Sequence, residues 1–413
     1  MIHALLVGAG LGLLALFPGF HFALLVLAAG PWFLAQFGLA DGLLGLVTAI
    51  TVARAMHTLA VVYHPVAADQ LASADPAQRL AAAGQDQFAT RLLGDGLWLG
   101  TAVTVGLVGV ATFLSQVYNF PFLKWAIGLL AWAVVPMFVF WFGFTLYKAK
   151  NRLSTLVVVL AAGVLGIIAL DHPAVRGSAH SMTPLLTGLF GLPVLLLVLG
   201  QKAHSVLTLG RTRQQRSLER DPPGELTLAG LGIGLLSVAL PGLGTSSLVT
   251  LAQDWAEDDA QYLKMAALAE TTAEMLALCL GILGLAQRSS DIAAITKVTS
   301  AAGHPEWVLG PVFPYAMLAT LLGACGVGLV LVKVLGAPYR WGIKHVPQKL
   351  QAIVVAAGMV WVVWSHTGEW GLAIMLVGTL IHLGARQLRV PNQAFFACIV
   401  APLALSMFEI TIF

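Results

Sequence analysis

The sequence predicts an all-α polytopic membrane protein made of two inverted repeats. Of its 413 residues, 58% are hydrophobic and only 10% are charged, a balance typical of chains that cross a bilayer several times. Two similar apolar stretches are each interrupted by Pro-Gly, and the basic residues are spread very unevenly over the loops. We therefore expect each repeat to be a Pro-Gly-broken re-entrant hairpin followed by about five transmembrane helices.

The two Pro-Gly stretches are GAGLGLLALFPGFHF at 8–22 and GLGIGLLSVALPGLGTSS at 230–247. The apolar arm before each break has about 15 residues, fewer than the roughly 20 needed to cross a bilayer. Because Pro lacks a backbone donor and Gly permits unusual dihedral angles, such a turn must face protein or a water-filled cavity. Paired interrupted segments indicate the substrate site of a transporter. The alternative is a pair of simple helix kinks.

The elements follow the same order in both halves. The first half, 1–200, is predicted to hold a hairpin at 2–37 and spans at about 42–63, 95–117, 123–147, 153–170 and 182–200. A basic linker at 201–224 follows, ending in Asp-Pro-Pro-Gly. The second half, 225–413, is predicted to hold a hairpin at 225–252 and spans at about 260–285, 309–332, 350–365, 370–385 and 392–411. The short arms 350–365 and 370–385 are also compatible with a further re-entrant pair.

The distribution of Lys and Arg predicts the orientation of these spans, because cytoplasmic loops carry an excess of basic residues. One alternating set of loops holds 17 of the 22 basic residues. If that set is cytoplasmic, the first hairpin enters from outside and the second from the cytoplasm, so the halves are inverted. The protein is then a multi-pass protein of the plasma (inner) membrane with both termini outside.

Arg54 is the one basic residue assigned to the membrane interior. It lies near the middle of the span 42–63, where a guanidinium costs roughly 2.5–3.5 kcal/mol on insertion scales. His57 is three residues away and shares its helical face. The planar guanidinium can hold a carboxylate or phosphate through two parallel hydrogen bonds, so Arg54 and His57 are candidate substrate ligands. The alternatives for Arg54 are an ion pair with Glu270 or Glu274, or snorkelling toward the loop.

Glu270 and Glu274 are the candidate ion-coupling pair. Their spacing of four residues places both on one face of the span 260–285. Two carboxylates in an apolar setting repel each other and resist ionisation, so they need a shared proton or cation. We expect H⁺ or Na⁺, with Thr271 supplying a hydroxyl oxygen. The alternatives are hydrogen bonding between helices by protonated acids, or pairing with Arg54 or Lys264.

The breaks supply further candidate substrate ligands. A half-helix that starts after a break directs its free N–H groups and its positive dipole end at whatever binds there. For His21 a structural hydrogen bond within the fold is an equal alternative. The candidates at the two breaks are Pro18, Gly19, His21, Pro241, Gly242, Gly244, Thr245 and Ser246.

Other classes of function lack support in the sequence. No HExxH, CxxC, GxSxG or Walker motif is present, so we expect no enzyme activity, no cofactor and no metal site. The three cysteines stand apart in apolar runs and are interpreted as small core residues. Nothing indicates binding to nucleic acid.

Several stretches resemble the large membrane subunit of tripartite tricarboxylate transporters, and more closely its shorter, mostly archaeal relatives. The stretches are GLGLLALFPGFH at 10–21, DPAQRLAAAGQDQFATRLLGDG at 75–96, LLTGLFGLPVLLLVL at 185–199, LAGLGIGLLSVALPGLGTSS at 228–247 and the C-terminal GLAIMLVGTLIHLGARQLRVPNQAFFACIVAPL. The resemblance implies an inverted-repeat permease driven by an ion gradient, with carboxylates as cargo. Between the first hairpin and residue 75 the chain has ARAMHTLAVVYHP in place of the family's Gly-Gly-Ser-rich second break.

The sequence as a whole predicts an ion-coupled secondary transporter of an organic anion, with a carboxylate bound at the membrane midplane between the two broken hairpins. The alternative is a translocase of a lipid-linked phosphate such as a polyprenyl phosphate. The expected partners are the small anion or lipid phosphate, H⁺ or Na⁺, and the lipid bilayer. A small membrane subunit, a periplasmic binding protein and a homo-oligomer remain open as further partners.

Overall fold

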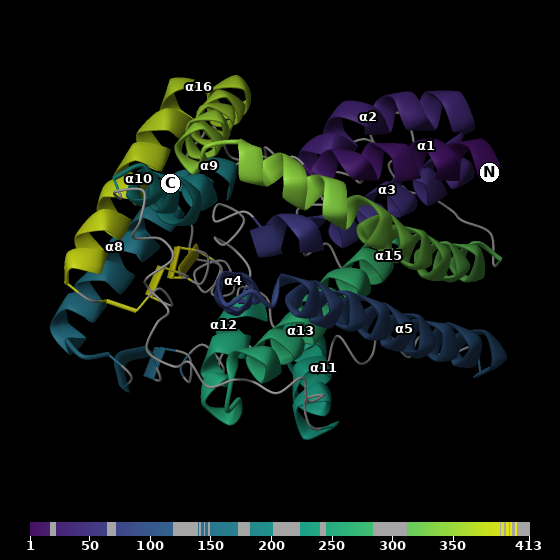
Figure 1. Ribbon diagram of the computed structural model, residues 1–413, viewed down its shortest axis with the longest axis horizontal. Helices are drawn as coiled ribbons and strands as arrows, with labels where there is room; N and C mark the ends of the chain where they lie inside the picture. The colour runs from purple at the N-terminus through teal and green to yellow at the C-terminus, as the bar shows by residue number, and fades with distance from the viewer. Residues whose placement is uncertain are drawn as a thin grey trace. The chain divides into compact units, whose positions relative to one another are not determined.

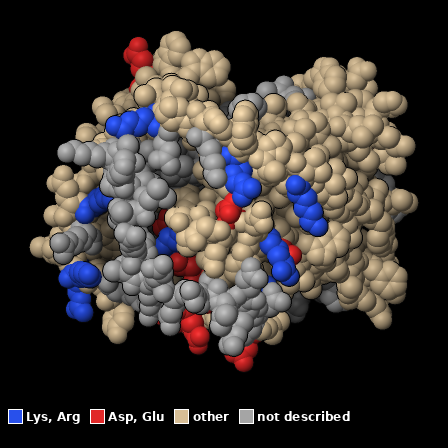
Figure 2. Space-filling view, in the orientation of Figure 1, with Lys and Arg blue, Asp and Glu red and all other residues tan. Residues whose placement is uncertain are grey.

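The computed structural model describes residues 1–16, 22–63, 72–118, 149–171, 182–200, 224–239, 245–283 and 312–388, with isolated positions at 139–147 and 390–402 (Figure 1). These residues are almost entirely helical and contain no strand, so the all-α prediction is confirmed. Six of their helices are long and apolar enough to cross a membrane. On the face that Figure 2 shows, few of the described side chains are Lys, Arg, Asp or Glu. These features support a membrane-embedded protein.

Most predicted spans have a matching helix. The six long helices are α3 (Leu39–Tyr63), α5 (Asp86–Tyr118), α8 (Arg152–Asp171), α13 (Asp259–Ile282), α15 (Phe313–His345) and α16 (Gln348–Gln387). Helices α5 and α15 extend well beyond the predicted spans, because a polar segment precedes the apolar run of α5 and another follows the apolar run of α15. Helix α16 contains both predicted short arms and is interrupted at Gly368, whose φ of 63° is a left-handed conformation that glycine adopts readily. The predicted span 123–147 lies largely outside the described residues.

Helical arms stand on both sides of each Pro-Gly break. They are α1 (Ile2–Gly12), the 3₁₀ turn η1 (Leu13–Leu16) and α2 (Phe22–Phe37) in the first half, and α11 (Gly224–Ala239) and α12 (Thr245–Leu251) in the second. The breaks at 17–21 and 240–244 lie outside the described residues. The re-entrant course of the hairpins therefore stays a prediction.

The chain forms two compact units, and each takes a part of both sequence halves. Unit 1 comprises Met1–Gly128, Gly210–Val238 and Val249–Val346, whereas unit 2 comprises Leu129–Leu209, Ala239–Leu248 and Pro347–Phe413. The hairpin and first long helices of each half thus belong mainly to unit 1, and the later spans to unit 2. The predicted 1–200 and 225–413 repeats remain a prediction about sequence halves.

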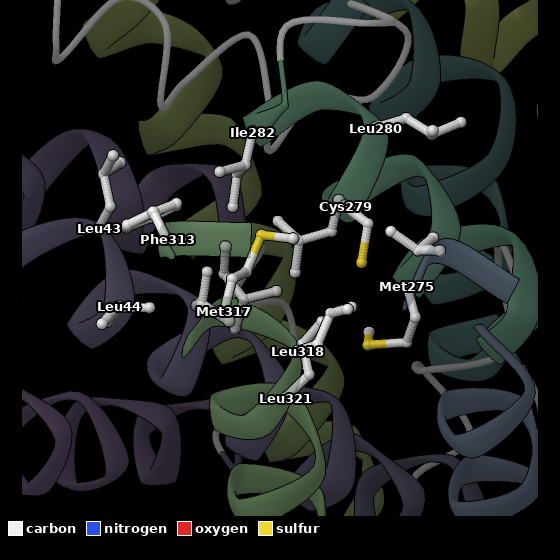
Figure 3. Packing of buried hydrophobic residues seen from close by; sticks show 14 of the residues in the cluster. Leu43, Leu44, Met275, Cys279, Leu280, Ile282, Phe313, Met317, Leu318 and Leu321 are labelled. Atoms are coloured by element: carbon white, nitrogen blue, oxygen red, sulfur yellow. The ribbon is translucent and has the colours of Figure 1, made fainter. Parts of the chain in front are cut away.

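Helices α3 and α13 form the centre of unit 1. Both are buried along nearly their whole length, which explains why small and apolar residues occur all round them rather than on one stripe. Figure 3 shows side chains from α3, α13 and α15 meeting in one apolar cluster. Its large members include Leu43 of α3, Met275 of α13, and Met317 and Leu321 of α15.

The same helix packing occurs twice in unit 1. A Cβ atom added at Gly8 of α1 would lie 2.2 Å from a backbone oxygen of α3, and one added at Gly12 would lie 2.9 Å from the next such oxygen, one turn along. In the second half, Gly230 and Gly234 of α11 make the matching approaches to α13, because a Cβ atom added at either would lie 2.7 Å from a backbone oxygen. Glycines spaced by four residues permit such close contact between helices in membranes.

The long helices cross over between the halves. Gly96 and Gly100 of α5 pack against Ala267 and Thr271 of α13, whereas Gly328 of α15 packs against α3. Each half therefore places its long helix on the central helix of the other half. This exchange makes the core of unit 1 depend on both halves of the sequence.

Polar contacts show which helix ends lie together in unit 1. Arg79 pairs with Asp259 at the start of α13, at 2.7 Å. Asp86, at the start of α5, accepts hydrogen bonds from Tyr63 at the end of α3 and from Arg340 near the end of α15. Pairs at the other helix ends join Gln116 to Tyr315 and Met1 to Asp41. Helix α3 consequently runs antiparallel to α13, and α5 runs antiparallel to α15.

Unit 2 has its own apolar core, formed by α8, α9 (Met182–Leu186), the π-helical turn η3 (Thr187–Gly191), α10 (Leu192–Gly200) and α16. Gly188 in the π turn lies against the backbone of Met375. Buried His382 makes a 2.6 Å hydrogen-bond contact with the Leu189 carbonyl oxygen and stacks on Phe395. The Gly-Leu-Phe-Gly sequence at 188–191 thus forms a close helix contact.

Candidate functional site

Arg54 lies at the centre of unit 1 and is paired with both predicted glutamates. Its Nε is 2.9 Å from Oε2 of Glu274, and one of its terminal nitrogens is 3.7 Å from Oε2 of Glu270. The Arg54 side chain is 8% exposed and that of Glu270 only 2%, whereas Glu274 is 38% exposed. Of the alternatives left open by the sequence, the ion pair with both acids is the one observed.

The helices bring these groups together because α3 and α13 lie against each other along apolar and small side chains. The hydroxyl groups of Thr51 and Thr58 on the Arg54 face donate to carbonyl oxygens of their own helix, at 2.8 and 2.7 Å. Their polarity is therefore satisfied within α3, which leaves the glutamates of α13 as the acceptors that compensate the buried guanidinium.

Ser73 is the second partner of Glu270. Its hydroxyl donates to Oε2 of Glu270 at 2.6 Å, and its backbone N–H donates to Oε1 at 3.2 Å. Ser73 stands immediately before helix α4 (Ala74–Ala82), so the carboxylate also lies at the positive end of a helix dipole. Both oxygens of Glu270 are hydrogen-bonded, as the burial of a carboxyl group requires.

Helix α4 fills the space beside α3, α5 and α13. Its buried face consists of Ala74, Pro76, Ala77 and Leu80, and these residues pack with the ends of the three neighbouring helices. Leu80 is the only large apolar side chain of α4, so its burial contributes only about 1.5–3 kcal/mol. Hydrogen bonds to a charged group contribute about 1.5–3 kcal/mol each. The polar anchors of α4 therefore count at least as much as its apolar contacts.

The far end of α4 is held at the surface by a bidentate ion pair. The Arg79 guanidinium donates to both carboxylate oxygens of Asp259, at 2.7 to 3.1 Å. The hydrogen bonds with Asp259 raise the pKa of Arg79 above its usual value. Both side chains are 40% exposed, so solvent weakens this pair relative to the buried contact of Glu270.

A small cavity lies next to the guanidinium. It is lined by polar groups of Arg54, His57, Ser73 and Thr271 and by apolar side chains of α3, α5 and α13. The volume open to the centre of a water molecule is about 10 Å³, which is room for about one water. As lined by the described residues, this cavity is therefore too small for a carboxylate cargo.

The charge balance of the cluster indicates what can bind there. One guanidinium faces two carboxylates, so the cluster carries a net charge of −1 when both acids are ionised. A proton taken up by either glutamate neutralises it. Among the described residues no group of three or more His, Cys, Asp and Glu side chains is arranged to hold a metal ion. The arrangement can therefore bind and release protons and can expose or cover one fixed positive charge.

The structure brings some of the predicted site residues together. Arg54, His57, Glu270, Glu274 and Thr271 all belong to the facing parts of α3 and α13. Thr245 and Ser246 begin α12 and belong to unit 2. The remaining predicted ligands lie outside the described residues, namely Pro18, Gly19, His21, Pro241, Gly242 and Gly244.

Ser73 was not predicted from the sequence as a site residue. It lies in a stretch that the apolar pattern assigns to a loop, and its contact with Glu270 joins distant parts of the chain. The available signal is the order Ser-Ala-Asp-Pro followed by Ala77, Leu80 and Ala81, which is typical of a helix start and an apolar stripe. That signal predicts a short helix but not the partner of the serine.

Comparison of the chain with protein family models, with curated proteins and with solved structures finds no match.

Proposed function

We propose that the protein is a proton-coupled secondary transporter of an organic anion, most simply a carboxylate. The observation that carries this proposal is the buried guanidinium of Arg54 held between two acids of the antiparallel helix α13. Buried ionisable groups inside membrane proteins are costly and are typical of substrate or ion pathways. A purely structural helix contact has no need of them.

The exposed member of the pair suggests the order of events. Glu274 is 38% exposed and makes the shorter contact with Arg54, so we assign it as the acid that takes up a proton first. Once neutral, Glu274 competes less well for the guanidinium, which is then available to an anionic cargo. A proton is favoured over Na⁺ because a proton needs only one carboxylate, whereas the described residues contain no group of three or more His, Cys, Asp and Glu side chains arranged to hold a metal ion.

The number of acids limits the charge of the cargo. With an anion of charge −1 and one added proton, the cluster keeps the net charge it has when empty. With two glutamates available, the same balance extends to a dianion. Mono- and dicarboxylates are therefore the proposed substrate class.

Transport by alternating access needs two states related by the symmetry of the fold. We propose that the two halves are inverted repeats. The proposal is supported by the glycine contacts that occur in both halves and by the opposite directions of the corresponding helices α3 and α13, and α5 and α15. In transporters of this kind one repeat or bundle rocks against the other around a fixed site.

The test is proton movement driven by carboxylates in proteoliposomes that contain a trapped pH-sensitive dye. Adding a panel of mono- and dicarboxylates outside should acidify the lumen for at least one compound with wild-type protein. Arg54→Gln should abolish the signal because the fixed positive charge is lost. Glu274→Gln should reduce it at least tenfold, and Glu270→Gln should do the same.

Acidification that persists in folded Arg54→Gln would remove the guanidinium from the mechanism. A signal that follows Na⁺ rather than the pH gradient would replace the proton by Na⁺. If no carboxylate acts but a polyprenyl phosphate raises the melting temperature of the purified protein, the lipid-phosphate translocase becomes the better assignment.

A further inference from the structure

Helix α4 begins beside the Arg54 cavity, where Ser73 stands immediately before its first residue. Ser73 is almost fully buried and lines the cavity together with Arg54 and His57. Six residues further on, Arg79 reaches Asp259 at the start of α13. Helix α4 therefore lies along α13, with its N-terminal end at the depth of Glu270 and its C-terminal end at the surface.

We propose that Ser73 links the charge of Glu270 to the position of α4, so that α4 closes the cavity while Glu270 is ionised and leaves it when Glu270 is neutral. Ser73 is then a positioning residue, and α4 is the gate on one side of the site. The role of the gate in transport rests on the proposed function, whereas the labelling experiment that tests the gate does not.

The hydrogen bonds give the physical reason. An ionised Glu270 accepts from both the hydroxyl and the backbone N–H of Ser73 and attracts the positive end of the α4 dipole. A neutral Glu270 loses the charge assistance, so its hydrogen bonds with the hydroxyl and the backbone N–H of Ser73 become weaker. The small apolar face of α4, with Leu80 as its one large side chain, then has less to hold it in place.

The test must distinguish the titration of Glu270 from that of the other charged and titratable groups near it. Arg54 and His57 lie on α3, Asp75 and Arg79 on α4, and Tyr262 and Glu274 on α13. The α5 and α11 residues that contact α13 most closely are glycines, which do not titrate. His57 is the residue in this set whose ordinary pKa lies nearest neutrality, and it needs its own control variant.

The experiment measures how fast a water-soluble maleimide labels a cysteine on α4 in the purified full-length protein. Ala77 is fully buried on α4, whereas Ala83 just after its end is exposed. The ratio of labelling rates for Ala77→Cys and Ala83→Cys cancels the pH dependence of the thiol reaction itself. Native Cys279, Cys325 and Cys398 are buried, and unmodified protein gives the background.

We expect the ratio to rise at least tenfold on acidification in the wild-type background. Ser73→Ala and Glu270→Gln should each give the high ratio at every pH, and Ser73→Thr, which keeps the hydroxyl, should behave as wild type. Asp259→Asn removes only the surface anchor, so it should raise the ratio a few-fold while leaving its pH dependence intact. His57→Gln should leave the whole profile unchanged.

A ratio that does not change with pH or with Ser73→Ala would overturn the gate, even if transport is proton-coupled. Loss of the pH dependence in His57→Gln, with its retention in Glu270→Gln, would also overturn it by assigning the sensor to the histidine. The labelling needs no cargo. A normal labelling pattern without carboxylate transport would therefore leave the gate in place and contradict only the proposed function.

Discussion

Helices α3 and α13 occupy equivalent places in unit 1, yet they carry opposite charges. Each is almost fully buried, receives a pair of glycines from the preceding hairpin arm and packs on the long helix of the other half. Helix α3 contributes Arg54, whereas α13 contributes Glu270 and Glu274. The shared features are those of packing, and the difference is one of charge. The comparison suggests that the shared packing provides the scaffold and that the chemistry lies where the two helices differ.

The strongest test of this equivalence asks whether the two halves of the chain are inverted in the membrane. The split of basic residues predicts that Ala83 and Ser290 lie on opposite sides of the bilayer. Ala83 is exposed after α4, and Ser290 lies outside the described residues. Single cysteines at these positions should be labelled from opposite faces of sealed vesicles. The expected effect is all or none, and labelling of both from the same face would contradict the inverted repeat.

Removing the charge of α3 should have the next largest effect. Arg54→Gln leaves buried Glu270 without its cation, and breaking a buried ion pair in this way costs about 3–5 kcal/mol. We expect the lower end of that range, because Glu274 is 38% exposed. The variant should melt at a lower temperature in detergent and should not transport.

The double variant Arg54→Gln, Glu270→Gln is the matched control. Because it removes the unpaired buried charge along with its partner, it should recover most of the lost thermal stability while remaining inactive. If the double variant is no more stable than Arg54→Gln alone, the destabilisation has another origin and the ion pair contributes little to folding.

The membrane class, the helical fold and the positions of most spans could be predicted because apolar runs report directly on helices in lipid. The lengths of α5 and α15 could not be predicted, because each helix extends beyond its apolar run. The polar extension of each is held by tertiary contacts such as that of Asp86 with Arg340. The sequence likewise identified Arg54 and the two glutamates as the residues that need partners. It could not decide among the partners, because that depends on how α3 and α13 face each other.

Ser73 shows more clearly which site residues cannot be predicted from the sequence. The cost of a buried charge is visible in a sequence, so Arg54 stands out in an apolar span. A serine in a polar stretch carries no such cost, and only its depth beside Glu270 gives it a role. Residues that position a charged group are therefore harder to predict than the charged group itself.

The smallest effects test whether the scaffold is indeed repeated. An alanine at Gly8 would place its Cβ 2.2 Å from the oxygen of Gly45, and one at Gly230 would place it 2.7 Å from the oxygen of Met265. Backbone must shift to relieve either clash, at a cost of about 1–3 kcal/mol for overpacking.

Neighbouring glycines of the same helices provide matched controls in both halves. A Cβ at Gly10 or Gly232 meets nothing within 4 Å, so alanine there should be neutral or slightly stabilising. Melting of the four single variants in detergent measures this directly. Equal losses at the two packed positions, with none at the controls, would support equivalent roles for α1 and α11, whereas a loss in only one half would show that the second contact is incidental to the fold.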